Sequence, residues 1–290
     1  MKSDTDAQPG DVVSTVRRSP DELVCLVGPG DAHQRTYRYL PSAELAALVR
    51  RCWIPVWSVP PGAEAPQRTL QDPVSLLVIS GDYARLHGVA PELSTTTLTG
   101  EGWAVGLVLA PATGYPLAGP AEGFNDRYVE LEEVLGDDGR ILADRVRSVI
   151  ATDPHRPEAH RDALKACEDT LRRLLPLDAE GQLVNALVAA VESDVELLQV
   201  TQICSRFDIG ERALQQLLRR RLGLTPKCLI QRRRLQEAAE RLLHESATQA
   251  DLAAAVGYAD EPHMIRDFLH VTGTTPSRFT AAQRDAWSGT

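Results

Sequence analysis

The sequence is poor in cysteine and in aromatic residues, and it has no long apolar run. Its five cysteines are widely spaced and no C-x-x-C pair occurs, so neither a zinc ribbon nor a disulfide framework is indicated. No apolar run approaches the ~18 residues that a membrane-spanning helix needs. The N-terminal stretch MKSDTDAQPG is polar and lacks the apolar core of a signal peptide. These absences predict a protein of the reducing cytoplasm that does not enter a membrane.

Several signatures of catalysis and cofactor binding are also missing. The sequence contains no P-loop, no G-x-S-x-G and no G-x-G-x-x-G, which argues against the common nucleotide sites and serine hydrolases. Only His33 and His87 precede residue 150, and no H-x-H pair occurs there, so a histidine-based metal site is not expected. We therefore expect no enzyme activity, no catalytic residue, no metal and no cofactor.

Charge is distributed unevenly along the chain. The net charge is -9, yet residues 193–290 carry 13 Lys and Arg against 12 Asp and Glu, while the remainder carries 18 against 28. The stretch Arg206–Arg234 holds nine basic and two acidic residues. An acidic part followed by a concentrated basic stretch is typical of a polyanion-binding module joined to another domain. On charge alone, a solvated arginine-rich helix face explains the stretch equally well.

Short apolar runs interrupted by turn residues fill the first half of the chain. Fifteen of the 19 prolines lie in residues 1–157, and runs such as Val74–Ile79 and Trp103–Leu109 end at glycine or proline. Short strands at this spacing predict a β-sandwich or barrel. We assign residues 1–36 to a flexible N-terminal arm and residues 37–150 to a β-rich sensor and dimerisation domain.

After about residue 140 the apolar pattern takes the period of a helix. The stripe from Leu164 to Leu175 recurs three and four positions apart, and a second stripe follows at 183–191. We assign residues 151–192 to a helical linker. The stripe either covers the β domain of its own chain or pairs with a second copy, and the second alternative predicts a homodimer.

The C-terminal part repeats itself with a period of about 50 residues. G-L-T-P at 223–226 recurs as G-T-T-P at 273–276, and the apolar position Leu214 recurs as Met264. Each copy has the pattern of a helix, a tight turn and a second helix with a polar outer face. Because these are the parts of a helix-turn-helix, two copies in register predict a double helix-turn-helix.

The turn and cap residues support this interpretation. Asp208 and Gly257 stand where each turn requires a positive φ, which glycine adopts freely and aspartate more readily than most residues. Asp260 is the predicted N-cap of the second helix in the second copy, and Gly210 is the weaker cap in the first.

Residues from about 195 to 285 resemble the DNA-binding domain of the AraC/XylS family of bacterial transcription regulators. The segment DLAAAVGYADEPHMIRDFLHVTGTTPSRF, residues 251–279, carries the resemblance most specifically, and ICSRFDIGERALQQLLRRRLGLTP is a looser match. The resemblance implies an all-α domain, which we assign to residues 193–285. It also implies a long helix from about Pro226 to Leu243, which places two recognition helices in successive major grooves.

Residues from about 37 to 135 resemble, more loosely, the cupin-like sensor domains that precede such modules. The expected fold is therefore α+β with two domains: a β-sandwich or cupin-like domain with flanking helices, then an all-α double helix-turn-helix domain. The implied function is sequence-specific transcription regulation, modulated by a small-molecule effector or by dimerisation, with double-stranded DNA and RNA polymerase as partners. The alternatives are a sensor with a degenerate module and an alkyl-transfer DNA-repair protein that uses Cys25 or Cys52.

The resemblance also assigns DNA contacts by position. Base-reading positions of the two recognition helices fall on Arg212, Gln215 and Gln216, and on Glu261, Pro262, His263, Ile265 and Arg266. Phosphate contacts fall on Arg219, Arg220, Arg221 and Lys227. Arginine pairs well with guanine and glutamine with adenine, whereas Glu261 accepts from cytosine but repels the backbone. We therefore expect the first recognition helix to dominate affinity.

Three tryptophans stand out in a chain that is 5% aromatic. Trp53 and Trp57 are four residues apart, so in an extended segment both rings lie on one face. With Trp103 they are candidates for an apolar effector pocket, although an ordinary sandwich core explains them equally. Cys25 and Cys52 are considered as redox sensors, and Cys52 follows two arginines.

Overall fold

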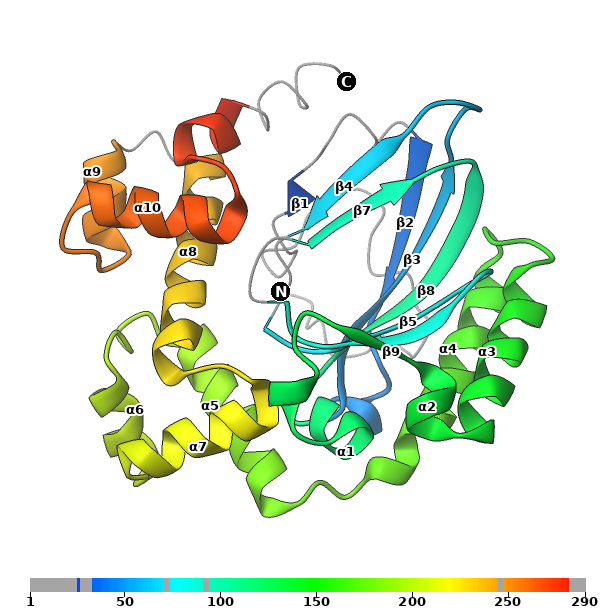
Figure 1. Cartoon of the computed structure of the whole chain (residues 1–290), viewed down its shortest axis with the longest axis horizontal. Helices are drawn as coiled ribbons and strands as arrows, with labels where there is room; N and C mark the ends of the chain where they lie inside the picture. The colour runs from blue at the N-terminus through cyan, green and yellow to red at the C-terminus, as the bar shows by residue number, and fades with distance from the viewer. Residues whose placement is uncertain (1–24, 27–32, 70–72, 91–93, 245–247, 282–290) are drawn as a thin grey trace, which may run out of the picture.

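The computed structural model describes residues 25–26, 33–69, 73–90, 94–244 and 248–281. The arm predicted at residues 1–36 lies almost entirely outside these ranges. As predicted, the fold is α+β, with a β-rich N-terminal part and a helical C-terminal part (Figure 1). Within the described ranges, no helix combines the length and the apolarity needed to cross a membrane.

A six-stranded antiparallel sheet forms the centre of the N-terminal part. Its strands, in spatial order, are β2 (Gln34–Tyr39), β3 (Val49–Ser58), β8 (Glu101–Leu109), β5 (Leu76–Ser80), β6 (Ala84–His87) and β9 (Tyr128–Glu130). A smaller sheet contains β1 (Cys25–Leu26), β4 (Ala65–Thr69) and β7 (Ser94–Leu98). The valine, leucine and isoleucine runs of β5 and β8 favour extended backbone because branched side chains pack well on a pleated surface.

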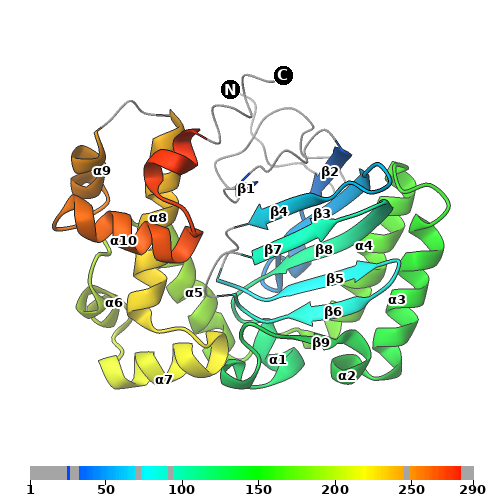
Figure 2. The ribbon, with the colours of Figure 1, turned by 45° about the horizontal axis from the view of Figure 1, so that its top comes forward.

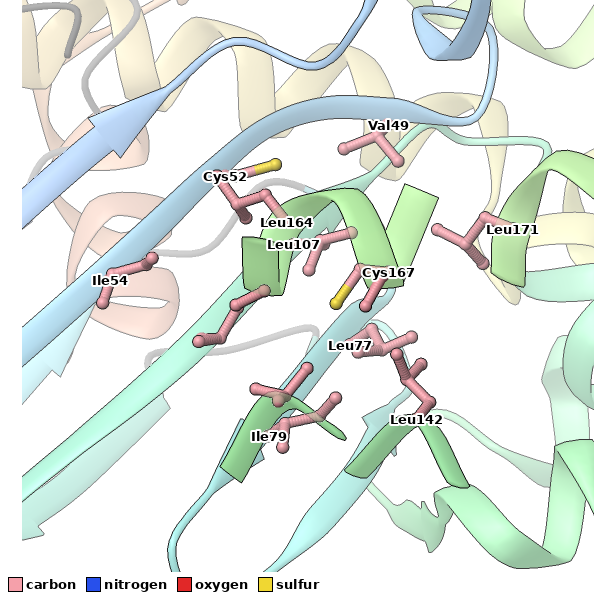
Figure 3. Packing of buried hydrophobic residues seen from close by; sticks show 14 of the residues in the cluster. Val49, Cys52, Ile54, Leu77, Ile79, Leu107, Leu142, Leu164, Cys167 and Leu171 are labelled. Carbon is pink, nitrogen blue, oxygen red and sulfur yellow. The ribbon is translucent and has the colours of Figure 1, made fainter. Parts of the chain in front are cut away.

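Helices cover one face of the large sheet (Figure 2). They are α2 (Leu131–Leu135), α3 (Asp137–Ile150) and α4 (Pro157–Leu171). In Figure 3, Leu164, Cys167 and Leu171 of α4 lie among the sheet residues Cys52 and Leu107, and each of the three is at most 5% exposed. The apolar stripe is therefore satisfied within one chain, and its alternative role as a dimer surface is wrong.

Short helical segments connect several of the longer elements. They are η2 (Ala43–Leu45), α1 (Gly114–Ala118), η3 (Ala121–Gly123) and η4 (Arg172–Leu174). The segments α1 and η3 follow β8 and lie beside the helical part (Figure 1).

The helical part is built around one long helix. Its elements are α5 (Ala179–Ser193), α6 (Val200–Phe207), α7 (Glu211–Leu222), α8 (Pro226–His244), α9 (Gln249–Ala255) and α10 (Glu261–Thr272). The helix predicted at 226–243 is α8, which at 19 residues is about 28 Å long. Its first half joins a core with α5, α6 and α7, and its second half joins a separate core with α9 and α10.

Local backbone geometry follows the sequence closely in this part. Asp208 and Gly257 adopt φ of 48° and 80° in the turns of the two motifs, as predicted. The side chain of Asp260 accepts a 2.7 Å hydrogen bond from the amide of His263, so it is the N-cap of α10. Both motifs are therefore complete helix-turn-helix units.

The helix α5 belongs by packing to the first of these units. The sequence assigned it to the linker 151–192, yet Val184, Leu187 and Val191 are buried in the same core as α7. Val89, from the loop after β6, is buried in that core as well. The packing favours a helical unit that begins at α5, and it ties this unit to the N-terminal part.

Candidate nucleic-acid interface

The two predicted recognition helices are α7 and α10, and both are attached to α8. Figures 1 and 2 show α7 beyond the N-terminal end of α8 and α10 crossing its C-terminal half. Each helix buries one apolar face, with Leu214 and Leu218 on α7 and Met264 and Phe268 on α10. The opposite, polar faces are therefore available to a ligand.

The outer face of α7 carries the residues predicted to read bases. Arg212, Gln215 and Gln216 are all exposed. The amide of Gln215 donates a 3.0 Å hydrogen bond to Glu211, one turn earlier, which orients that side chain on the surface. Arg212 and Lys227 are exposed and have no carboxylate partner among the described residues. The structure thus brings the first predicted reading set together on one surface.

Fewer arginines of the basic stretch Arg206–Arg234 are available to a ligand than its composition indicates. Most of its arginines are paired within the chain: Arg206 with Asp194, Arg219 with Glu122, Arg220 with Glu180, Arg221 with Asp178 and Glu180, and Arg233 with Glu237. Arg232 donates to the carbonyl of Ala90. A large share of the positive charge therefore has an internal counterion, which a count of basic residues cannot reveal.

Arg221 is a structural residue, so its assignment as a phosphate contact is wrong. Its side chain is 4% exposed, and its Nη2 donates to Asp178 at 2.5 Å and to Glu180 at 2.8 Å. Its guanidinium also lies 4.1 Å from the ring centroid of Tyr115. Hydrogen bonding to Arg221 lowers the pKa of both carboxyl groups, which keeps them charged.

The second reading set is only partly displayed. Pro262, His263 and Arg266 are exposed and Glu261 is half-buried, but Ile265 packs against the core of the second unit. Ile265 therefore presents only part of its side chain to a ligand.

His263 is held by two residues that the sequence analysis missed. Its ring meets the ring of Tyr258 edge-on at 5.3 Å, and its Nε2 lies 3.6 Å from the Asp267 carboxylate. The Tyr258 hydroxyl donates to the same carboxylate at 3.1 Å. Burial and the neighbouring Asp267 raise the pKa of Tyr258, which keeps it a donor. The four-residue spacing of His263 and Asp267 on one helix is the sequence signal that would have indicated this contact.

The three tryptophans are divided between the two faces of the sheet. Trp53 and Trp57 lie on one face, over Gly106 and Gly102, where a Cβ atom would meet each ring at 2.3 Å. Trp103 packs on the opposite face, against the core beneath the helices. Two of the three candidate effector residues therefore share a surface, and the glycines opposite them make room for the rings.

The buried cysteines are poorly suited to nucleophilic chemistry. Cys52 and Cys167 lie in the core of the N-terminal part (Figure 3). Burial raises the pKa of Cys52 well above its usual value and that of Cys167 to about 12, so the reactive thiolate is disfavoured. The side chain of Cys25 lies outside the described residues. Among the residues that the structure describes, no group of three His, Cys, Asp or Glu side chains could hold a metal ion.

Comparison with known proteins separates the two parts of the chain. A family described as a helix-turn-helix domain matches residues 203–282, which run from α6 past α10. A family described as a domain of unknown function (DUF6597) matches residues 37–130. The cupin-like character expected for the N-terminal part stays a prediction.

A curated relative matches about a third of the chain. The HTH-type transcriptional activator RhaR of Cronobacter sakazakii is 31% identical over 98 residues, which cover 33% of this chain and 35% of that protein. The chain thus matches about a third of the length of this relative.

Similar solved structures have low TM-scores. A transcriptional regulator with an AraC-type DNA-binding domain from Chromobacterium violaceum is 24% identical, with 36% of this chain and 95% of that chain covered and a TM-score of 0.34. ToxT from Vibrio cholerae O395 is 12% identical, with 86% and 96% covered and a TM-score of 0.39. The helix-turn-helix family match and the two motifs on α8 therefore identify the helical part as a double helix-turn-helix domain.

Proposed function

We propose that the C-terminal part of this chain is an AraC/XylS-type double helix-turn-helix domain and that the protein is a sequence-specific DNA-binding transcription regulator. One observation carries the proposal: two complete helix-turn-helix units, each with its own core, are joined by the single helix α8. A helix of about 28 Å approaches the length of one DNA turn, so it suits two recognition helices in successive major grooves.

The exposed residues of the two helices divide into reading and positioning roles. On α7, Arg212 reads guanine and Gln215 and Gln216 read adenine, since these pairs match donors and acceptors in the major groove. Arg219, Arg220 and Lys227 contact phosphates and fix the register.

On α10, Arg266 and His263 read bases, and Pro262 contributes apolar contact. Glu261 accepts from cytosine and repels the phosphate backbone, so it discriminates between sequences more than it adds affinity. The half-buried Ile265 has a minor part in reading and a larger part in the core.

The N-terminal part, residues 37–150, modulates this activity through a small-molecule effector or through dimerisation. Trp53 and Trp57, on one sheet face, are the proposed apolar wall of an effector site, with Trp103 behind the sheet as support. A homodimer and RNA polymerase are the further partners proposed. The buried, protonated Cys52 gives no support to the alternative of alkyl transfer.

A gel-shift titration tests the proposal. The protein should bind duplex DNA from the region upstream of its own gene more tightly than a shuffled duplex of the same length. The double variant Arg212→Ala/Arg266→Ala should lose this preference. The variant Arg161→Ala, which removes an exposed arginine from α4, should keep it. Equal binding of both duplexes by the unchanged protein would contradict sequence-specific regulation.

A further inference from the structure

Two arginines on α7 already have carboxylate partners that come from outside the helix-turn-helix. Arg219 Nε lies 3.0 Å from Glu122 Oε1, and Arg220 Nη2 lies 2.6 Å from Glu180 Oε2. Both arginines are at the surface, with side chains 72% and 43% exposed, so burial does not force these pairs. In the proposed function, DNA phosphates would meet these same two arginines.

Glu122 is carried by a loop that is anchored to the end of α7. Asn125 Nδ2, in that loop, donates hydrogen bonds to the carbonyls of Leu222 at 3.2 Å and Gly223 at 3.1 Å. Gly223 ends α7 with φ of 67°, and a Cβ atom there would lie 2.0 Å from Asn125 Nδ2. The close approach therefore depends on glycine, and it holds η3 and Glu122 beside Arg219.

Glu180 is fixed by a different set of contacts. It accepts from the buried Arg221 at 2.8 Å, and Arg221 in turn lies over the ring of Tyr115 in the N-terminal part. The same carboxylate accepts from Arg220 through both oxygens at 2.6 Å. The position of this acid is thus set by a buried guanidinium and does not rest on the exposed pair alone.

The two anchors belong to a wider contact between the N-terminal part and the first helix-turn-helix. Val89 is 2% exposed within the core of α5, α7 and α8. Arg232, on α8, donates to the carbonyl of Ala90 at 2.5 Å. Glu122 is therefore presented by a packed interface and stays beside Arg219 whenever this interface is closed, whereas Glu180 lies on α5 of the helical unit itself.

We propose that Glu122 and Glu180 act as internal substitutes for DNA phosphates, which compete for Arg219 and Arg220 and lower the affinity of the first recognition helix for DNA. A phosphate that approaches this end of α7 must displace a carboxylate and is repelled by it. Through Glu122, the N-terminal part thereby lowers DNA affinity by charge. This inference rests on the proposed DNA-binding function.

Glu122→Gln in the full chain is the primary test, because Glu122 is exposed and, within the described part of the chain, forms an ion pair only with Arg219. The probe is random-sequence duplex DNA, and binding is followed by fluorescence anisotropy at several salt concentrations. We expect about two- to fivefold tighter binding, the scale of an exposed ion pair. The slope of log K against log salt should steepen by about 0.9, because one more phosphate is contacted.

Glu158→Gln is the matched control. It makes the same charge change at an exposed ion pair, with Arg161 on α4, so it reports the effect of net charge alone. Removal of Arg219 by Arg219→Ala should weaken binding more in the Glu122→Gln background than in the unchanged protein. Glu180→Gln should act like Glu122→Gln at Arg220, with circular dichroism to check that the altered contact to Arg221 leaves the fold intact.

The outcomes separate the two claims. If the unchanged protein binds DNA, and Glu122→Gln and Glu158→Gln agree in affinity and in salt slope, the competition is absent and the inference is wrong. If neither the unchanged protein nor the Glu122→Gln/Glu180→Gln variant binds duplex DNA, the proposed function itself fails.

Discussion

Gly223→Ala should destabilise the protein by about 2–5 kcal/mol, because two costs meet at one position. Alanine at a φ of 67° costs about 1–2 kcal/mol, since its Cβ crowds the carbonyl that follows. The same Cβ would lie 2.0 Å from Asn125 Nδ2, so the two hydrogen bonds of that amide are lost, at about 0.5–1.5 kcal/mol each.

Gly273→Ala is the matched control for backbone strain. Gly273 also ends a helix in the left-handed conformation, at φ of 66°, but it is exposed. Its substitution should therefore cost only the conformational part, about 1–2 kcal/mol. In an Asn125→Ala background, Gly223→Ala should fall to this smaller cost, because the partner that it displaces is already gone.

Urea denaturation followed by circular dichroism measures the free energies of unfolding of the unchanged protein and of these four variants. Equal costs for Gly223→Ala and Gly273→Ala in the unchanged protein would refute the reasoning. So would strict additivity of Gly223→Ala and Asn125→Ala, because it would show that the loop does not grip the end of α7.

Three other predictions follow from burial and exposure. Arg266→Ala should cost about 1–3 kcal/mol at the preferred DNA site, relax the preference at one base pair and leave binding to random duplexes unchanged, as a titration of both DNAs would show. In the native protein, maleimide labelling followed by mass spectrometry should spare the buried Cys52 and Cys167 and reach Cys204, whereas labelling of all three at one rate would contradict their burial. Burial lowers the pKa of His160, so as the pH falls the unfolded chain binds a proton at this residue before the folded protein does. The free energy of unfolding should therefore be constant above about pH 6.5 and fall as the pH drops toward the folded pKa of His160. Unfolding of the His160→Gln variant should lack this part of the pH dependence.

The features that the sequence predicted well are those set by neighbouring residues. The turn positions Asp208 and Gly257, the N-cap Asp260 and the long helix α8 all depend on backbone preferences and on periodicity within a few turns of helix. Because the chain contains two copies of the motif, each copy supported the interpretation of the other. The exposed reading faces followed from the same periodicity.

The features that it did not predict depend on partners distant in the chain. Arg221 has the pattern of a surface arginine, and only its contact with Asp178 and Glu180, about 40 residues earlier, makes it a buried residue. The pairing of Arg219 with Glu122 spans nearly 100 residues, so no local pattern records it. The sequence analysis grouped Trp103 with Trp53, but their rings lie on opposite faces of the sheet. The face of each ring depends on the register in which β3 pairs with β8, and neither strand's own sequence specifies that register.

The central claim is that α7 and α10 read two DNA elements from one rigid connecting helix. Selection of bound sequences from a random duplex pool, with the full-length protein, tests it most directly. We expect two enriched elements whose centres lie about one helical turn apart, 10–10.5 base pairs. The same selection with Arg266→Ala should lose information in one element and keep the other. A pool without enrichment, or with a single element that Arg212→Ala and Arg266→Ala weaken alike, would contradict the account.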